Sequence, residues 1–319
     1  MSFKITPSGQ NTMEHVIHVQ NLTKIYGKLI AVDHINFDVH KGEIFGFLGP
    51  NGAGKTTTLR MLTGIIKPNQ GKADILGFNI QKEPLKAKQN IGVVPETSNA
   101  YVDLSAWQNM MLMSELYGIP KKEAERRSKS LLERLNLYDR RNDKVKGFSK
   151  GMKQRLILCM ALVNDPQIIF LDEPTSGLDV HSSLLIRDIL QEFPDHNKTI
   201  FLTTHNMDEA NYLCDRVAII NKGKIAAIDR PGNLKNTIKK LKSIEVSFDK
   251  TVNIQKLSTI PNINEVRKEG DKFIIGTDNI NDLIHSVTNF AQQENLKIIT
   301  LNTRDPSLEE VFLKITGET

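Results

Sequence analysis

A glycine-rich loop between a predicted strand and a predicted helix constrains the fold of this chain more than any other feature. An apolar run at residues 44–48 predicts a buried strand, and residues 57–62 have the composition of a helix start. Between them, Gly49, Gly54, Lys55 and Thr56 match the phosphate-binding pattern GxxxxGK[ST]. Such a loop binds phosphate because glycines let backbone N–H groups turn inward and the helix N-terminus adds positive potential.

The residue types of this loop also indicate its ligand. Lys55 is placed to reach the β- and γ-phosphates of a nucleotide, and the Thr56 hydroxyl is placed to ligate Mg²⁺. A chance match is the alternative, but chance would not supply the strand and the helix on either side. We therefore predict a nucleoside triphosphate site formed by Gly49, Pro50, Asn51, Gly52, Ala53, Gly54, Lys55, Thr56 and Thr57.

Length and composition set the general class of the protein. A chain of 319 residues predicts about two domains, and 39% hydrophobic with 25% charged residues is ordinary for a globular protein. The net charge of +5 would suit nucleic acid or an anionic membrane surface, but scattered positive charges favour a solvated surface. Cys159 and Cys214 stand far apart in apolar surroundings, so we expect buried thiols in a reducing compartment.

The sequence shows no membrane span and no signal peptide. Apolar runs such as 168–171 and 217–220 have the length of strands, far below the ~18 residues that a membrane-spanning helix needs. Residues 1–14 are polar and lack the apolar segment of a signal peptide. We expect residues 1–15 to form a loose N-terminal tail.

Two short alternating segments, 16–19 and 35–39, predict half-buried strands ahead of the phosphate loop. Tyr26 lies between them. An aromatic ring at that place either stacks on a nucleotide base or packs within a hairpin, and the residue pattern leaves both open. After the loop, a strand at 91–94 is followed by Pro95 and then by Glu96.

A mostly helical stretch is predicted at residues 104–142. Its methionine and aromatic side chains between residues 107 and 117 form either core or a binding surface, and core is favoured. Beyond it, Phe148-Ser149-Lys150-Gly151-Met152 begins a helix that runs to about residue 164. Ser149 is a good N-cap, so the first N–H groups of this helix point outward.

Two neighbouring carboxylates, Asp172 and Glu173, follow the apolar strand at 168–171. Acids at the carboxyl ends of buried strands line the sites of α/β folds. Nucleotide hydrolysis needs one acid for Mg²⁺ and one for the attacking water. His205 follows the next predicted strand, 199–203, in the same way, and is either a phosphate contact or an ordinary surface or core histidine.

These motifs form an ordered set, and through them residues 16–230 resemble the ATPase subunit of ATP-binding cassette (ABC) transporters. The order is the phosphate loop, Val94-Pro95-Glu96, the 148–152 motif, the 168–173 strand with its two acids, the 176–179 turn, and His205. Six motifs in this order identify the family specifically, whereas any one of them alone would not. The resemblance implies an α/β fold, a P-loop NTPase cassette at 16–232 with a mixed sheet core and a helical subdomain at about 104–164.

The resemblance also implies a role for each matching residue. Tyr26 would stack on adenine, and Glu173 would be the general base, with Lys55 and His205 as further catalytic residues at the γ-phosphate. The ligands of Mg²⁺ would be Thr56, Glu96 and Asp172.

A second group of residues would act across the interface of a dimer. Ser149, Gly151 and Met152 would contact the ATP of a partner subunit, and Asp179 would lie in the turn at the dimer interface. The family motif is usually LSGGQ, and the serine and second glycine are kept here, so we expect function to survive. Glu96 stands where glutamine is common; it still offers an oxygen to Mg²⁺, but it adds charge and donates no hydrogen bond, which would affect rate.

Residues 243–319 predict a second unit, after a lysine-rich helix at 234–241. Its predicted elements are a strand at 244–248, a helix at 252–258, a hairpin at 263–276, a helix at 280–290, a strand at 297–301 and a last helix from Asp305-Pro306. The order β-α-β-β-α-β indicates a small ferredoxin-like accessory domain. It carries no catalytic constellation, so we expect a role in regulation or dimer support.

The function implied by the resemblance is that of an exporter motor. ATP, with Mg²⁺, would be hydrolysed in a head-to-tail dimer, expected to be of identical chains, to drive export through a separate polytopic transmembrane permease. The chain would then be peripheral, at the cytoplasmic face of the cell membrane.

A soluble ABC ATPase acting on nucleic acid or ribosomes is the alternative, and it would explain the pI near 9.0. That class tends to carry two cassettes or long coiled-coil insertions, which this chain lacks, so no nucleic-acid partner is expected. A P-loop GTPase or kinase would share neither the 148–152 motif nor the paired acids. The cargo is not encoded, because its path would lie in the other chain.

Overall fold

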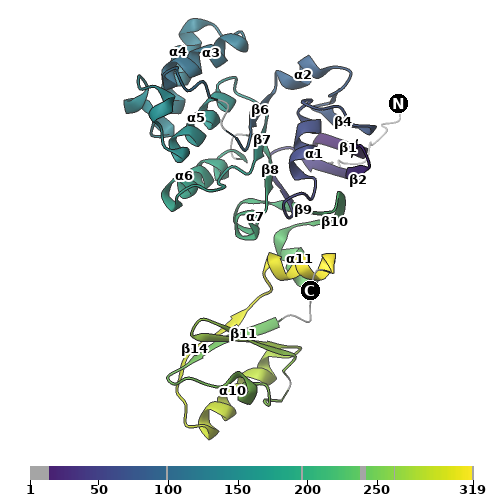
Figure 1. The fold of residues 1–319 in the computed structure, drawn as a ribbon, viewed down its shortest axis with the longest axis vertical. Helices are drawn as coiled ribbons and strands as arrows, with labels where there is room; N and C mark the ends of the chain where they lie inside the picture. Colours follow the sequence, from purple (N-terminus) through teal and green to yellow (C-terminus); the bar gives the residue numbers. More distant parts are fainter. Residues whose placement is uncertain (1–13, 98–99, 195–196, 238–241, 262, 318–319) are drawn as a thin grey trace, which may run out of the picture. The chain divides into compact units, whose positions relative to one another are not determined.

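The computed structural model describes residues 14–97, 100–194, 197–237, 242–261 and 263–317 (Figure 1). The chain divides into two compact units, Met1–Ile228 and Asp229–Thr319. Of the tail predicted at 1–15, residues 1–13 lie outside the described residues, and His15 already belongs to the first strand.

The first unit contains two sheets. The smaller has the strand order β2-β1-β4-β5, from β1 (His15–Tyr26), β2 (Leu29–His40), β4 (Gln70–Ile75) and β5 (Phe78–Asn79). The larger has the order β10-β9-β3-β8-β7-β6, from β3 (Ile44–Leu48), β6 (Ile91–Val94), β7 (Ile168–Asp172), β8 (Thr199–Thr204), β9 (Arg216–Asn221) and β10 (Lys224–Asp229). Strands β6, β7, β8, β3 and β9 are parallel. Their carboxyl ends therefore share one edge of the sheet.

Strands β1 and β2 are longer than the sequence predicts. Their pairing shifts register between Val19 and Leu22 and at three further places, and Asn21 has a left-handed φ of 47°. Each shift reverses the face on which the next side chains lie. The alternation that reveals a strand is therefore visible only in parts of each segment.

Phenylalanine rings join the two sheets. Phe37 of β2 stacks on Phe45 of β3 with 5.6 Å between ring centroids, and Phe201 of β8 lies 5.9 Å from Phe45. All three side chains are buried, and such rings contribute much of the apolar area of a core. This packing fixes β3, the strand that leads into the phosphate loop.

Seven α-helices are described in the first unit. They are α1 (Lys55–Leu62), α2 (Pro84–Lys88), α3 (Ala106–Leu116), α4 (Lys121–Arg134), α5 (Lys150–Leu162), α6 (Val180–Gln191) and α7 (Met207–Leu213). The predicted helical subdomain is present as α3, α4 and α5, which gather on one side of the parallel strands while α1 lies on the other (Figure 1). Met110 is fully buried, so core is the correct interpretation there, although Leu116 is 71% exposed.

Two local findings complete this unit. Cys159 and Cys214 are free and buried, as predicted, and burial raises the pKa of both thiols. Among the described residues, no helix has the length and apolar character needed to cross a membrane.

The second unit confirms the predicted order of its elements. These are α8 (Pro231–Asn236), β11 (Lys242–Phe248), α9 (Ile254–Leu257), β12 (Glu265–Glu269), β13 (Lys272–Thr277), α10 (Ile280–Gln293), β14 (Ile298–Arg304) and α11 (Leu308–Thr316). The antiparallel sheet has the order β12-β13-β11-β14, as a split β-α-β unit requires. The helix predicted at 234–241 begins earlier than predicted, because α8 starts at Pro231, and proline suits a first helical position. Residues 238–241 of that prediction lie outside the described residues.

Candidate nucleotide-binding site

The phosphate loop connects the end of β3 to the first turn of α1. Gly54 is the N-cap of α1 and has a φ of 107°. A Cβ atom there would lie 2.5 Å from the carbonyl oxygen of Ala31 on β2. Both the dihedral angle and the close approach to β2 therefore require glycine.

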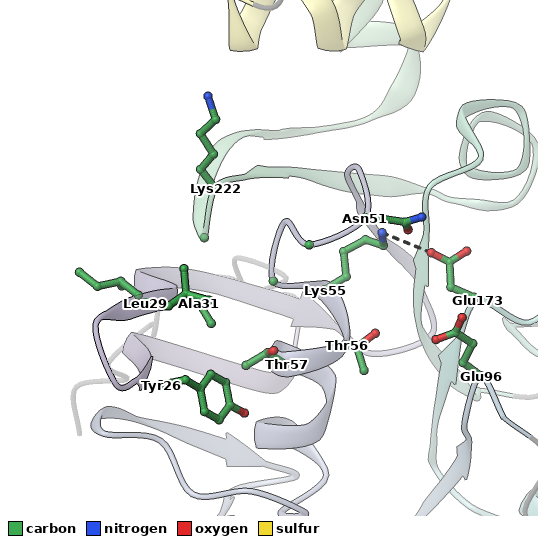
Figure 2. Close-up of a pocket in the computed structure, with 14 residues that line it drawn as sticks. Tyr26, Leu29, Ala31, Asn51, Lys55, Thr56, Thr57, Glu96, Glu173 and Lys222 are labelled. Carbon is green, nitrogen blue, oxygen red and sulfur yellow. Dashed lines mark ion pairs between the residues drawn. The ribbon is translucent and has the colours of Figure 1, made fainter.

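A cavity of about 660 Å³ opens beside this loop (Figure 2), within the usual range for small-molecule sites. It is lined by Tyr26, Leu29, Ile30, Ala31, Asn51, Gly52, Gly54, Lys55, Thr56, Thr57, Glu96, Glu173, Lys222 and Gly223. The predicted residues on this lining come from four separate stretches of sequence. Residues 29–31 and 222–223 were not predicted, because they reach the cavity only through the folding of β2 and of the β9–β10 hairpin.

One end of the cavity is apolar. Tyr26 ends β1 and is 47% exposed, and Leu29 and Ile30 beside it are also exposed. The ammonium of Lys24 lies 5.2 Å from the centre of the Tyr26 ring. A tyrosine packed inside a hairpin would be buried, so this geometry favours the stacking role over the packing role.

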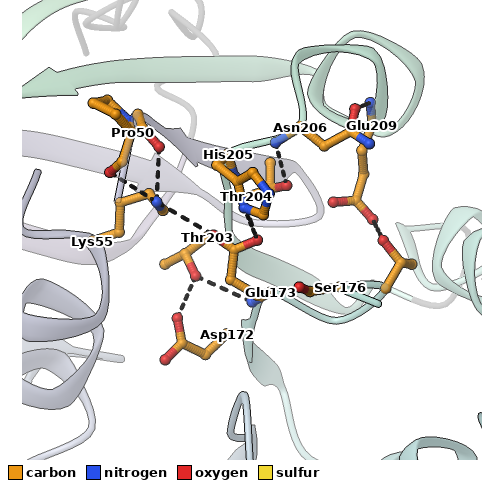
Figure 3. A network of polar contacts seen from close by, with 12 residues as sticks. Pro50, Lys55, Asp172, Glu173, Ser176, Thr203, Thr204, His205, Asn206 and Glu209 are labelled. Carbon is orange, nitrogen blue, oxygen red and sulfur yellow. Dashed lines mark hydrogen bonds and ion pairs between the residues drawn. The ribbon is translucent and has the colours of Figure 1, made fainter. Parts of the chain in front are cut away.

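Lys55 lies at the opposite end, where it is 95% buried, being only 5% exposed. Its Nζ atom donates to the carbonyl oxygens of Gly49 at 2.7 Å and Pro50 at 3.1 Å. It also lies 3.3 Å from Oε1 of Glu173, an ion pair drawn in Figures 2 and 3. The buried cation is thus held by three oxygens at the point where a phosphate would supply others.

The two acids and the histidine meet at the edge formed by β7 and β8 (Figure 3). Nδ1 of His205 donates to Oε2 of Glu173 at 2.8 Å. Asp172 Oδ1 accepts from the Thr56 hydroxyl at 3.1 Å. The arrangement places His205, 48% exposed, against the candidate base, which favours its functional interpretation over that of an ordinary histidine.

The residues of the 148–152 motif do not line this cavity: none of the described lining residues comes from the motif. Ser149 is the N-cap of α5 as predicted, accepting from the Met152 N–H at 3.2 Å. Lys150 Nζ donates to the carbonyl of Ser176 at 2.8 Å. A Cβ on Gly151 would lie 2.2 Å from the Ser182 hydroxyl, so this glycine permits α5 to approach α6.

Asp179 is the N-cap of α6, which for that reason starts two residues before the predicted 182. Its carboxylate accepts from the Ser182 N–H at 2.9 Å and from the Ser182 hydroxyl at 2.8 Å. These hydrogen bonds lower the pKa of Asp179. The α5 start and the 176–179 turn are therefore parts of one connected surface.

The donor set fits Mg²⁺ bound together with a nucleotide. Mg²⁺ takes one or two carboxylates and completes its shell with phosphate oxygens and water. Thr56 and Asp172 supply a hydroxyl and a carboxylate at hydrogen-bond distance from each other, and Glu96 lines the same cavity. Within the described part of the chain no cluster of three or more His, Cys, Asp or Glu residues could hold a metal without such help.

The fold and the site define a phosphate-loop nucleotide-binding cassette, and comparisons with known proteins identify its family. Residues 32–176 match the family model described as ABC transporter. The linearmycin resistance ATP-binding protein LnrL of Bacillus subtilis (strain 168) is 34% identical over 309 residues, spanning 95% of this chain and 99% of that protein. The chain belongs to the ABC transporter family; it binds ATP and is an ATPase.

Further similarities agree with this assignment. The Nod factor export ATP-binding protein I of Rhizobium etli is 36% identical over 301 residues, covering 94% of this chain and 93% of that protein. A solved ATP-binding subunit of an ABC transporter superposes with a TM-score of 0.65 at 28% identity, over 70% of this chain and 93% of that one. A dimeric ATP-binding cassette bound to ADP and Pi has a TM-score of 0.63 at 26% identity, over 67% of this chain and 98% of that one.

Proposed function

We propose that the chain is the motor subunit of an exporter and drives a separate polytopic transmembrane permease from the cytoplasmic face of the membrane. The observation that carries the proposal is the convergence of Lys55, Asp172, Glu173 and His205 beside the nucleotide cavity. The relatives named for Nod factor export and for linearmycin resistance match along nearly the whole chain, which supports export as the purpose of hydrolysis.

In this proposal the residues around the cavity bind the nucleotide and activate the water that hydrolyses it. Tyr26 stacks on the base, the N–H groups of residues 49–57 surround the phosphates, and Lys55 leaves Glu173 to bind the γ-phosphate. Glu173 then accepts the proton of the attacking water while His205 holds its second oxygen. Mg²⁺, held by Thr56, Asp172 and Glu96, would neutralise charge on the phosphates.

Two cassettes are needed to complete the site. Ser149, Gly151 and Met152 begin α5 and do not line the cavity in their own chain, whereas a helix N-terminus favours contact with an anion. We infer that they face the ATP of an identical partner in a head-to-tail dimer, with Asp179 at the contact. The dimeric solved cassette supports this arrangement.

We further propose that residues 16–232 act as the cassette and 243–319 as an accessory domain that supports or regulates the dimer. The alternative, a soluble ATPase acting on nucleic acid or ribosomes, is not favoured by the named relatives.

Purification of the tagged full-length chain from gently solubilised membranes tests the proposal. The Glu173→Gln variant with ATP is the bait, because slow hydrolysis keeps a dimer closed, and Lys55→Ala is the matched control. We expect a polytopic membrane protein to be retained by the first and reduced with the second. Recovery of ribosomal proteins or nucleic acid with no membrane protein would contradict it.

A further inference from the structure

A threonine that no motif singled out lies between the two acids of the site. Thr203 is on β8, and the parallel register pairs it with Asp172 of β7. Its side chain is fully buried. Because β8 and β7 are neighbours in the sheet, the position of this hydroxyl is fixed by backbone hydrogen bonds on both strands.

The Thr203 hydroxyl connects both acids (Figure 3). It donates to Asp172 Oδ1 at 2.5 Å and accepts from the backbone N–H of Glu173 at 3.3 Å. The same N–H also reaches the Thr203 carbonyl oxygen at 3.1 Å. Glu173 has a left-handed φ of 51°, a strained value for this residue, so its N–H needs such an anchor.

Asp172 Oδ1 therefore accepts two hydroxyl hydrogen bonds, from Thr203 at 2.5 Å and from Thr56 at 3.1 Å. The carboxylate is 4% exposed, so water has little access to replace either donor. Outer hydrogen bonds of this kind orient a metal-binding carboxylate and tune its affinity.

We propose that Thr203 is a positioning residue for the metal shell, holding the Asp172 carboxylate in the orientation that binds Mg²⁺ beside ATP. The inference rests on the proposed role of Asp172. Thr203 touches neither nucleotide nor metal; its hydroxyl acts through Asp172, and its backbone carbonyl keeps Glu173 in place when the hydroxyl is removed.

The test measures metal binding without hydrolysis. A non-hydrolysable ATP analogue is titrated into the full-length protein with Mg²⁺ and with EDTA, and the ratio of the two Kd values is taken. Because the affinity of free analogue for Mg²⁺ is common to every variant, a change in the ratio equals the change in metal affinity of the protein complex. Thr203→Ala should shift the ratio by about 10-fold or more, while its Kd in EDTA should stay within about twofold of the wild-type value. Thr203→Ser should restore the wild-type ratio.

Two further variants keep the outcomes distinct. Thr199→Val is the matched control, since Thr199 is a fully buried threonine on the same strand whose hydroxyl accepts from the Gly42 N–H at 2.9 Å, at the other end of β8. A wild-type ratio in Thr203→Ala, or an equal shift in Thr199→Val, overturns the role of Thr203. An unchanged ratio in Asp172→Asn overturns the metal assignment itself.

Should Thr203→Ala fail to fold, Thr203→Val supplies the same measurement with the β-branched shape kept. A wild-type ratio in that variant would equally overturn the proposal.

Discussion

Replacing Glu173 with glutamine should separate ATP binding from hydrolysis. Glutamine keeps the size of the side chain, which is 8% exposed, and its amide oxygen can still accept a hydrogen bond from Lys55 or His205, but it cannot accept the proton of water. A general base contributes about 10²–10⁴ in rate, equivalent to about 3–5 kcal/mol of the activation barrier. Turnover should fall by that factor.

Affinity for ATP should rise in the same variant. Lys55 Nζ lies 3.3 Å from Oε1 of Glu173, so the lysine must weaken that contact to bind phosphate. A hydrogen bond to a charged partner is worth about 1 kcal/mol more than one to a neutral partner, so the neutral amide should tighten binding by about fivefold. The lost charge also removes a repulsion with the γ-phosphate.

The assay pairs equilibrium titration with a fluorescent ATP analogue and phosphate release at saturating Mg·ATP. Glu43→Gln is the matched control, because Glu43 is likewise 8% exposed but precedes β3 at the edge away from the loop. Turnover of Glu173→Gln within threefold of wild type would transfer the base role elsewhere, with Glu96 and His205 as the next candidates. An equal loss in Glu43→Gln would mean that the loss comes from neutralising a buried carboxylate anywhere in the cassette and not from losing the base.

Three other expectations follow from single side chains. Lys55→Ala should abolish nucleotide binding in a direct titration, because it removes the one buried cation at the phosphate end among the described cavity residues; affinity within a few-fold of wild type would remove Lys55 from the site. Glu96→Gln should remain active and hydrolyse ATP at least as fast, since it removes a negative charge from the cavity lining; a loss beyond tenfold in steady-state turnover would show that the carboxylate is required. Burial raises the pKa of Glu43 above its usual 4.5, so its ionisation costs stability as pH rises through that raised pKa. Glu43→Gln keeps the oxygen that accepts from His40 and Arg216 without ionising. The melting temperature of Glu43→Gln should therefore exceed that of wild type at pH 7.5 and approach it near pH 4. A difference in melting temperature that stays the same at both pH values would contradict this expectation.

Much of the site was predictable because it follows uninterrupted apolar strands. The runs that became β3 and β7 are buried on both faces, so the sequence marks them clearly, and the loop or acids come directly after. Ser149 was recognisable as an N-cap from its residue type alone. Local chemistry was sufficient at these positions.

Other parts depend on strand register or on contacts distant in sequence. Thr203 reaches Asp172 only because β7 and β8 pair in one register; the one available signal was a hydroxyl residue two positions before His205 at a strand end. The link from Lys150 to Ser176 joins residues 26 positions apart. The bulges in β1 hid its length, since alternation is lost at each shift.

If ATP is held between two chains, two variants that are inactive alone should restore activity when they are combined. Lys55→Ala removes the phosphate end of a chain's own site, whereas Ser149→Arg replaces the α5 N-cap with a large cation that cannot cap the helix. Each variant alone should release phosphate only at background rate. Mixed in equal amounts, they form heterodimers with one doubly damaged site and one intact site, so part of the wild-type rate should be recovered. A mixture that stays inactive although heterodimers are detected, or Ser149→Arg hydrolysing at the wild-type rate as a monomer, would contradict it.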